Sequence, residues 1–301
     1  MVGSLPGLLP LYQAVTRWLW GSAVENGLVL IRLERFAFYM DAEEPIEGLL
    51  FDAYEPATSF VFERLVTPGD LVVDAGAHWG YFTLLAATLC GETGRVIAFE
   101  PHPRNVSVLT KNLRANHLDN VDVVAKAVSD REGPAKLFLS RGSGGSSLNP
   151  VPPEFSSAQN DYLSVETVTL DRFFADSGRR PALVKIDIEG AEPAAFEGMK
   201  TLIRETPDLV LITEFNPFYL PGAGGEAFLE RLMEQALELA IIDDARFRIE
   251  AGAPQQVLQQ ALNKGYTVNL LAARPWRIAR VLSSEAISGA SHRRAPKIVR
   301  L

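Results

Sequence analysis

Short apolar runs alternate with helical segments through the middle of the chain, and this alternation constrains the fold more than any other sequence feature. Strand-type runs are expected at residues 71–75, 95–100, 121–128, 165–169, 182–187 and 208–214, helices at residues 81–90, 103–117, 191–205 and 226–239, and a helical turn at 170–176. Apolar strands that alternate with helices are typical of parallel sheets buried on both faces. The pattern therefore predicts a doubly wound α/β fold with helices on both faces of the sheet.

Smaller elements are expected on either side of this region. Residues 27–40 have the composition of one or two strands, and residues 60–65 that of a short helix. Beyond the last long helix, residues 240–249, a helix near residues 255–263 and residues 266–272 can complete the sheet. We therefore expect three parts: an N-terminal extension of strands and helix at residues 1–65, one large domain at residues 66–275, and a basic C-terminal tail at residues 276–301.

Charge and composition exclude several classes of protein. The formal net charge of −8 argues against a general nucleic-acid binder, although the tail carries six basic residues against Glu285 alone. We expect a solvated tail, with an anionic partner for it as the alternative. The single cysteine, Cys90, excludes an internal disulfide and a cysteine-built metal site. Neither a signal peptide nor a continuous apolar span is recognisable, so a cytoplasmic protein without a membrane span is expected.

A glycine turn follows the first strand of the alternating region, in the sequence VVDAGAHWGYF at residues 72–82. In an open α/β sheet, ligands bind beyond the carboxyl ends of the strands, where this turn is expected to lie. The glycines follow the pattern G-x-x-x-G, from Gly76 to Gly80, with His78 at the position where the dinucleotide fingerprint G-x-G-x-x-G has its second glycine. A nicotinamide dinucleotide is therefore disfavoured.

Two acidic residues near strand ends indicate a different nucleotide. Asp74 precedes the turn, where a carboxylate would repel a pyrophosphate but suit a cationic ligand. Glu100 ends the second strand, before Pro101, and a carboxylate there can accept both ribose hydroxyls. S-adenosylmethionine carries an ammonium and a sulfonium and no phosphate, so the pair favours this cofactor. Local capping by both acids is the structural alternative.

Five segments together resemble the FkbM family of S-adenosylmethionine-dependent methyltransferases. They are VVDAGAHWGYF (72–82), VIAFEPHPRNVSVLTKN (96–112), TLDRFF (169–174), LVKIDIEGAE (183–192) and LVLITE (209–214). The segment KIDIEGAE is the most diagnostic. The resemblance covers residues 70–215, with a further strand near 265–271, and nothing carries over to residues 1–65 or to the tail after residue 275.

The resemblance implies a class I methyltransferase fold, which is a Rossmann-like, seven-stranded, mostly parallel sheet with one antiparallel strand. It also implies a cofactor site in which the turn holds the methionine end, Glu100 the ribose and residues 128–130 the adenine. The expected cofactor-binding residues are Asp74, Gly76, His78, Gly80, Tyr81, Glu100, Pro101, Val128, Ser129 and Asp130. Such families often carry Asn where this chain has His78, and loop support is the simpler role for either side chain.

Carboxylates at the ends of the fourth and fifth strands are the candidate catalytic groups. Asp187, Glu189 and Glu214 are expected at the same sheet edge as the glycine turn, because carboxyl ends of parallel strands meet there. One of them could take a proton from the acceptor. Alternatively, two or three could hold Mg²⁺ or a similar hard cation. Glu192 is expected to cap the next helix, and Lys185, within the strand, to pair with a carboxylate.

These residues together predict a methyltransferase, with O-methylation of a small-molecule or saccharide hydroxyl as the main hypothesis. The alternatives are N-methylation, a cofactor-binding assembly protein without activity, and a nicotinamide oxidoreductase. No nucleic acid is expected as partner. Acceptor specificity is expected in residues 1–65, in the loop at residues 141–160 and in residues 216–255.

Overall fold

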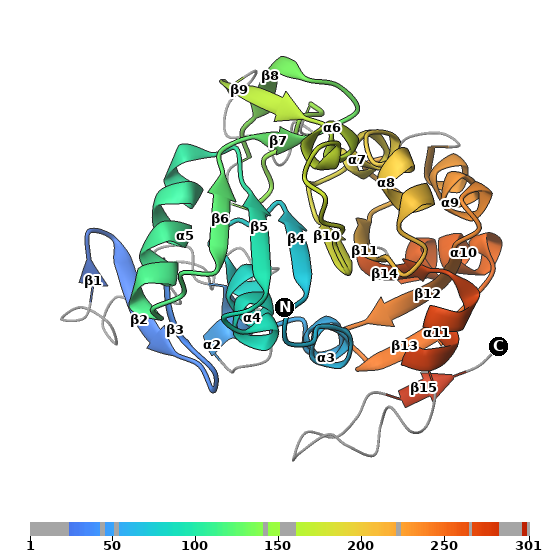
Figure 1. Cartoon of the computed structure of the whole chain (residues 1–301), viewed down its shortest axis with the longest axis horizontal. Coiled ribbons are helices and arrows are strands. Elements are labelled where there is room, and N and C mark those ends of the chain that lie inside the picture. Colours follow the sequence, from blue (N-terminus) through green and yellow to red (C-terminus); the bar gives the residue numbers. More distant parts are fainter. Residues whose placement is uncertain are drawn as a thin grey trace, which may run out of the picture.

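A nine-stranded sheet forms the centre of the protein in the computed structural model, which describes residues 24–42, 46–50, 54–140, 144–150, 161–220, 224–264, 267–282 and 297–299 (Figure 1). Its strands lie in the order β15-β13-β12-β14-β11-β10-β4-β5-β6. Their bounds are β4 (Leu71–Ala75), β5 (Arg95–Phe99), β6 (Val121–Val124), β10 (Leu183–Ile186), β11 (Val210–Phe215), β12 (Glu238–Asp243), β13 (Arg248–Ala251), β14 (Val268–Ala273) and β15 (Lys297–Val299). The mostly parallel α/β sheet predicted from the sequence is confirmed.

The seven expected strands run from β6 to β12, and the two others extend one edge of the sheet. Within the seven, β14 alone runs in the opposite direction, because it pairs antiparallel with both β11 and β12. Beyond them, β13 pairs antiparallel with β12 and β15 pairs parallel with β13. The sequence had indicated 240–249 as part of the sheet, and it forms most of this β12–β13 hairpin.

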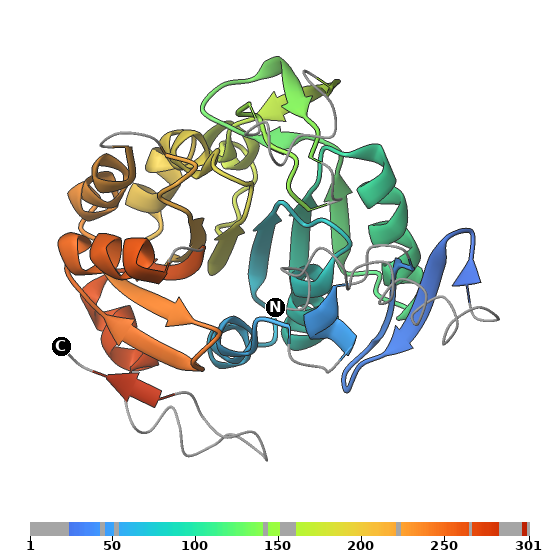
Figure 2. The same ribbon diagram turned by 180° about the vertical axis from the view of Figure 1, so that it is seen from behind.

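Helices cover both faces of the sheet, and alternating strand residues build one core on each side (Figure 1; Figure 2 from behind). Val72 packs into the first core and Val73 into the second, as expected for a strand buried on both faces. The first core also contains residues of α3 (Pro56–Leu65), α4 (Tyr81–Cys90), α5 (Pro103–Ala115) and α11 (Pro275–Val281). The second contains residues of α6 (Leu170–Phe174), α7 (Glu192–Glu197), α8 (Lys200–Glu205), α9 (Gly224–Glu234) and α10 (Pro254–Lys264).

Three expected elements are divided or shortened. The helix expected at residues 191–205 is two helices, because the chain turns at Gly198, where a Cβ atom would lie 2.1 Å from the Ser129 carbonyl oxygen. The strand expected at 121–128 is also two, and its second half leaves the main sheet. The helix expected at 226–239 ends at Glu234, and Leu239 already belongs to β12.

Two small sheets flank the central one. At the top of Figure 1, β7 (Ala127–Val128), β9 (Tyr162–Val168) and β8 (Gly133–Phe138), of which β8 was not expected, pair in the order β7-β9-β8. At the left edge, β1 (Val24–Glu25), β2 (Leu28–Arg32) and β3 (Ala37–Asp41) lie beside α5. Asn112 on α5 and Asn116 at its C-cap bond the backbone of Tyr39 and Ala37, respectively, through both amide atoms, so they extend the β3 edge as a neighbouring strand would.

The ends of the chain are described only in part. The short helix α2 (Glu47–Leu50) precedes α3, whereas the first 23 residues and most of the 141–160 loop lie outside the described residues. Part of the expected tail is ordered, since α11 buries Ile278 and Val281 against the first core. The division at residues 65 and 275 stays a prediction. Among the described helices, none has the length and apolar character needed to cross a membrane.

Candidate active site

The candidate site lies where the sheet changes direction of winding, between the neighbouring strands β4 and β10. From β4 the chain proceeds to β5 and β6 on one side, and from β10 to β11 on the other. The carboxyl ends of these two strands are held in register by the bond from the Asp187 N–H to the Ala75 carbonyl, 3.0 Å. This is the position at which doubly wound sheets bind their ligands.

Gly76 brings the two strand ends into contact. Its φ angle of +85° lies in the left-handed region, and a Cβ atom there would lie 1.8 Å from the Asp187 carbonyl oxygen. Only glycine therefore permits this backbone approach. This close approach also fixes the position of the Asp187 backbone, from which its side chain extends.

Glu100 organises the turn from the end of β5. One carboxylate oxygen accepts the His78 N–H at 2.8 Å, and the other accepts the His102 N–H at 2.9 Å and the Asn105 side-chain amide at 3.3 Å. Burial raises the Glu100 pKa, while these donors act in the opposite direction. Glu100 thus lies at the wall of a cavity with its carboxylate held in a fixed orientation.

A narrow cavity beside Glu100 contains several of the expected cofactor residues. Gly76, His78, Glu100, Pro101 and Val128 all line it, as do residues that were not expected: Phe99, Asn105, Lys126, Ala127 and Leu137. The described part of the 141–160 loop covers the same cavity. There, Ser147 donates to the Ile188 carbonyl at 3.4 Å and the Asn149 side-chain amide to the Gly190 carbonyl at 2.7 Å. These bonds therefore hold the loop against residues 188–190 at the wall of the cavity.

The other expected cofactor residues do not line this cavity. Asp74 points instead into the face covered by α4, where its carboxylate accepts the Thr83 hydroxyl at 2.6 Å. The Tyr81 hydroxyl lies 3.1 Å from the Ser59 hydroxyl. Gly80 faces the Leu109 side chain, while Ser129 and Asp130 follow the end of β7. Their roles in cofactor binding stay predictions.

His78 lines the cavity but is poorly suited to act as a base. Burial lowers its pKa to about 4, and the nearby charges of His102 and Lys185 act in the same direction against that of Asp187. The imidazole stacks on Trp79 with 4.4 Å between ring centroids. The backbone N–H of His78, bound to Glu100, is its main link to the site.

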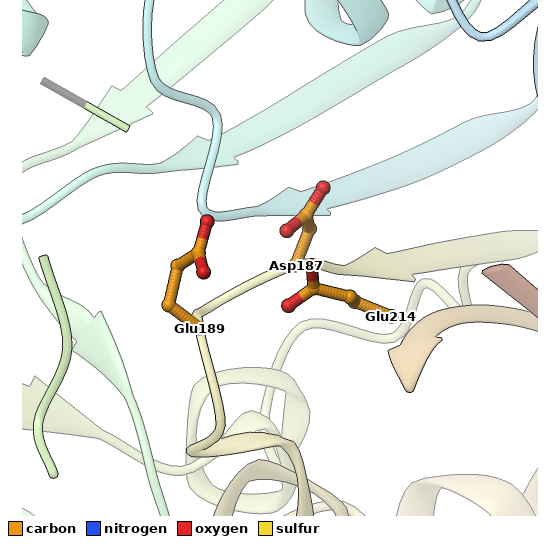
Figure 3. Close-up of side chains that lie close together, drawn as sticks. All are labelled: Asp187, Glu189 and Glu214. Atoms are coloured by element: carbon orange, nitrogen blue, oxygen red, sulfur yellow. The ribbon is translucent and has the colours of Figure 1, made fainter. Parts of the chain in front are cut away.

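Three carboxylates meet at the edge of β10 and β11. Figure 3 shows the side chains of Asp187, Glu189 and Glu214 directed toward one another, and one oxygen of each lies within 4.8 Å of the others. Glu214 is 8% exposed, and its Oε2 atom has no hydrogen-bond partner. The sequence-based expectation that these three residues would lie together is confirmed, and such a cluster can hold a proton or a cation.

Glu189 and Glu214 resist ionisation because they are largely buried and lie close to other acids. Burial, with the charges of Asp187 and Glu192, raises the pKa of Glu189 to about 8. Burial and the same neighbours raise the pKa of Glu214 well above its usual range. Glu192 has a different role: its Oε1 atom accepts the N–H groups of Ile188 and Gly190 at 2.9 and 3.2 Å, which supports the turn.

Lys185 is the cation that balances part of this charge, as the sequence had indicated. Its ammonium group is 3% exposed, lies 2.7 Å from Asp187 and faces the Phe82 ring at 4.7 Å from the centroid. Burial would lower its pKa, but the charges of Asp187, Glu55 and Asp74 together raise it. The lysine therefore stays charged and anchors the Asp187 carboxylate.

Replacing Lys185 with methionine is expected to destabilise the fold by about 3–5 kcal/mol, because the carboxylates of Asp187 and Asp74 would lose their cation. Urea unfolding followed by circular dichroism measures this change. The matched control is Lys200→Met on the surface pair with Glu197, where a loss of about 0–1 kcal/mol is expected. Equal losses in both variants would contradict the anchoring role of Lys185.

A second, acidic cavity of about 310 Å³ adjoins the three carboxylates. Glu55 and Asp244 line it, and Asn269 donates to both, at 2.8 and 3.4 Å. Burial raises the pKa of Glu55 to about 7. Neither acid was expected in the site. Asp244 had a readable signal, since it follows a strand that runs parallel to β11, whereas Glu55 had none because it lies within the N-terminal extension.

A third cavity, of about 700 Å³, is more apolar. Pro193, Phe218 and Tyr219 line it together with Asn149 and Glu189. Glu189 is the residue that joins the three spaces, because it lines the cavity beside Glu100, the acidic cavity and this one. Its backbone φ of +58° lies in the left-handed region and aims the side chain into this junction.

Comparison with known proteins gives the following matches. A family model described as a methyltransferase FkbM domain matches residues 74–248. No curated protein matches the chain. Among solved structures, fibrillarin of Aeropyrum pernix with natively bound S-adenosyl-L-methionine is 11% identical, with a TM-score of 0.41 and coverage of 82% of this chain and 83% of that one.

Two further solved structures give similar values. TYW2 of P. horikoshii in complex with MeSAdo is 12% identical, with a TM-score of 0.42 and coverage of 89% of this chain and 86% of that chain. Precorrin-6y C5,15-methyltransferase of Geobacter metallireducens GS-15 is 13% identical, with a TM-score of 0.41 and coverage of 73% and 87%.

Proposed function

The chain belongs to the FkbM methyltransferase family and is an S-adenosylmethionine-dependent methyltransferase, and we propose from this premise that it methylates a hydroxyl of a small, polar, saccharide-like acceptor. The observation that carries the proposal is the position of Glu189 at the junction of the three cavities. A group in that position can contact an acceptor in the acidic cavity or in the third, more apolar cavity while the donor occupies the cavity beside Glu100.

The cavity beside Glu100 is the proposed site of the donor. Glu100 would accept the ribose hydroxyls there, and Val128 with Phe99 would contact the adenine. Gly76, which has no Cβ, lets the backbone of Asp187 approach the turn, so both residues line this cavity. When bound, S-adenosylmethionine supplies a methyl group on its sulfonium sulfur, and in-line attack by the acceptor oxygen on that methyl group releases S-adenosylhomocysteine.

The acidic cavity is the proposed site of the reacting hydroxyl. The carboxylates of Glu55, Glu214 and Asp244 offer acceptors to the several hydroxyls of a sugar-like molecule. The acceptor oxygen must lose its proton as it bonds to the methyl carbon, and Glu189 or Asp187 would take that proton. Acids on this wall and the net charge of −8 disfavour a phosphodiester acceptor, so we do not propose a nucleic acid as substrate.

Two variations of this function are supported by specific observations. The excess of acids in the cavity also favours binding of an amine as its cation, which would give a proton to one of these carboxylates before its nitrogen attacks the methyl group, so N-methylation is the second candidate. In addition, the three oxygens within 4.8 Å of one another provide the ligands that a hard divalent cation prefers. Such an ion would lower the pKa of an acceptor hydroxyl bound to it, so that the proton could pass to water without a general base.

Calorimetric titration tests the premise for the cofactor. S-adenosylmethionine and S-adenosylhomocysteine are expected to bind with saturable heats and NAD⁺ to show none, because the G-x-x-x-G turn and Glu100 suit a nucleoside without pyrophosphate. Incubation with matched glycosides and amino sugars, followed by mass spectrometry, then identifies the methylated atom. Methylation of amines alone would overturn the hydroxyl proposal, and binding of NAD⁺ alone would overturn the assignment of the cavity.

A further inference from the structure

A large cavity of about 910 Å³ lies at the amino-terminal ends of the central strands, whereas the candidate active site lies at their carboxyl-terminal ends. Leu71, the first residue of β4, and Ala182, just before β10, line it, so it adjoins the amino ends of the strands whose carboxyl ends form the site. Because of this position, the cavity has no part in the proposed methyl transfer.

Arginine dominates the walls of this cavity. Five arginines line it from three separate segments: Arg64 at the end of α3, Arg179 and Arg180 before β10, and Arg277 and Arg280 on α11. Arg277 and Arg280 are three residues apart on α11 and therefore share one side of the helix. We refer to this cavity with its five arginines as the arginine groove.

Part of this positive charge has no ion-pair partner among the described residues. Arg180 pairs with Glu205 at 3.1 Å. In contrast, no ion pair is formed by Arg64, Arg179 or Arg277 in the described part of the chain. This is unusual in a chain whose net charge is −8.

Two buried polar atoms beside the groove have no hydrogen-bond partner. They are Arg277 Nε and Thr206 Oγ1, and both belong to residues that line this groove. Leaving such atoms unsatisfied costs stability unless a ligand or water satisfies them. Neither atom is accessible to solvent in the free protein, so a ligand that offers several acceptor oxygens would satisfy them after a change of side-chain rotamer.

We propose that the arginine groove binds a small molecule that carries phosphate groups. Guanidinium groups match phosphate oxygens in geometry and charge, and the separation of the arginines over three segments suits more than one phosphate. The acids at the groove favour a small ligand over a long polyanion. Asp70 accepts from the Thr67 N–H and hydroxyl at 2.7 and 3.0 Å, Asp208 accepts from Trp276, and both residues line the groove.

Calorimetry with inorganic pyrophosphate at low ionic strength tests this proposal, with inorganic phosphate as the smaller probe. Pyrophosphate is expected to bind one site per chain, and more tightly than phosphate. Arg277→Gln should raise the pyrophosphate Kd by about tenfold or more, because a charge-assisted hydrogen bond is lost. Arg114→Gln, on an exposed arginine of α5, makes the same change of charge away from the groove and should leave the Kd within about twofold.

Thr206→Val provides a variant whose folding is not at risk, because the hydroxyl that it removes has no partner in the free protein. It should weaken pyrophosphate binding by about threefold or more while methyl transfer is unchanged. Absence of pyrophosphate binding, or equal Kd values for Arg277→Gln and Arg114→Gln, would overturn the proposal. Tighter binding of a single-stranded RNA oligonucleotide than of pyrophosphate, lost in Arg277→Gln, would replace the small ligand by a nucleic acid.

Discussion

Replacing Glu189 with glutamine is expected to lower the turnover of methyl transfer by about 10²–10⁴-fold, the usual contribution of a positioned acid or base. Glutamine has nearly the same shape but cannot accept the acceptor proton. The change removes one ionisable group at the junction of the three cavities and leaves the Glu100 wall of the donor cavity intact. Turnover measured by mass spectrometry and the Kd of S-adenosylhomocysteine measured by calorimetry separate the two effects.

The affinity for S-adenosylhomocysteine should change by less than about threefold in this variant if Glu189 acts on the acceptor alone. Glu230→Gln, on an exposed position of α9, makes the same chemical change away from the site and serves as the control. Full turnover in Glu189→Gln would exclude a proton-transfer role. Asp187, which lines both the donor and the acidic cavity, would then be the remaining candidate base next to the donor.

The same variant separates the general base from a divalent cation. With a carboxylate base, treatment of the wild-type protein with a chelator leaves turnover unchanged. With a cation held by Asp187, Glu189 and Glu214, the chelator abolishes turnover, and Mg²⁺ restores it in the wild type at lower concentration than in Glu189→Gln. Each result excludes one of the two roles of the cluster.

The meeting of these three carboxylates was predictable from the sequence, for a geometric reason. Asp187 and Glu214 come at the ends of apolar runs, and carboxyl ends of neighbouring parallel strands lie at one sheet edge. Glu189 follows two residues later in the same turn. The fold was predictable in the same way, since the alternation of runs and helices leaves few arrangements other than a doubly wound sheet.

The direction of the Asp74 side chain depends on which face of β4 it occupies. Residues in a strand alternate between its two faces, and Asp74 lies on the face of Val72, toward α4, and not at the edge. In the structure the Asp74 carboxylate accepts the Thr83 hydroxyl and its charge helps to raise the pKa of Lys185. A contact between Asp74 and the cofactor stays a prediction.

Other parts of the site depend on tertiary contacts that no local pattern encodes. Glu55 lies just before α3 and reaches the acidic cavity because of the position of that helix. The Asp244 carboxylate holds the start of α3 beside the site, since it accepts the N–H groups of Ala57 and Thr58 at 2.8 and 2.9 Å. The strand β8 was not predicted, and Gly133 and Pro134 at its start have low strand propensity. Its pairing with β9 places Leu137 on the donor cavity.

Replacing Gly76 with alanine is expected to destabilise the protein by about 3–5 kcal/mol and to reduce turnover by more than about 100-fold. The new methyl group would lie 1.8 Å from the Asp187 carbonyl oxygen, and a backbone atom in a paired strand end cannot move aside as a side chain can. Relief of the contact must separate the end of β4 from that of β10, which displaces Asp187 from the donor cavity. Urea unfolding and turnover measure the two losses.

Gly27→Ala is the matched control, because Gly27 has a φ of +78°, close to the +85° of Gly76, but no atom within 4 Å of the added Cβ. Its cost should be limited to the backbone strain of a left-handed alanine, about 1–2 kcal/mol, with turnover unchanged. The difference between the two variants therefore isolates the contact with Asp187. If both lose the same stability, the approach of the two strand ends is looser than the structure indicates. If Gly76→Ala retains turnover despite its loss of stability, Asp187 does not need its present position for methyl transfer.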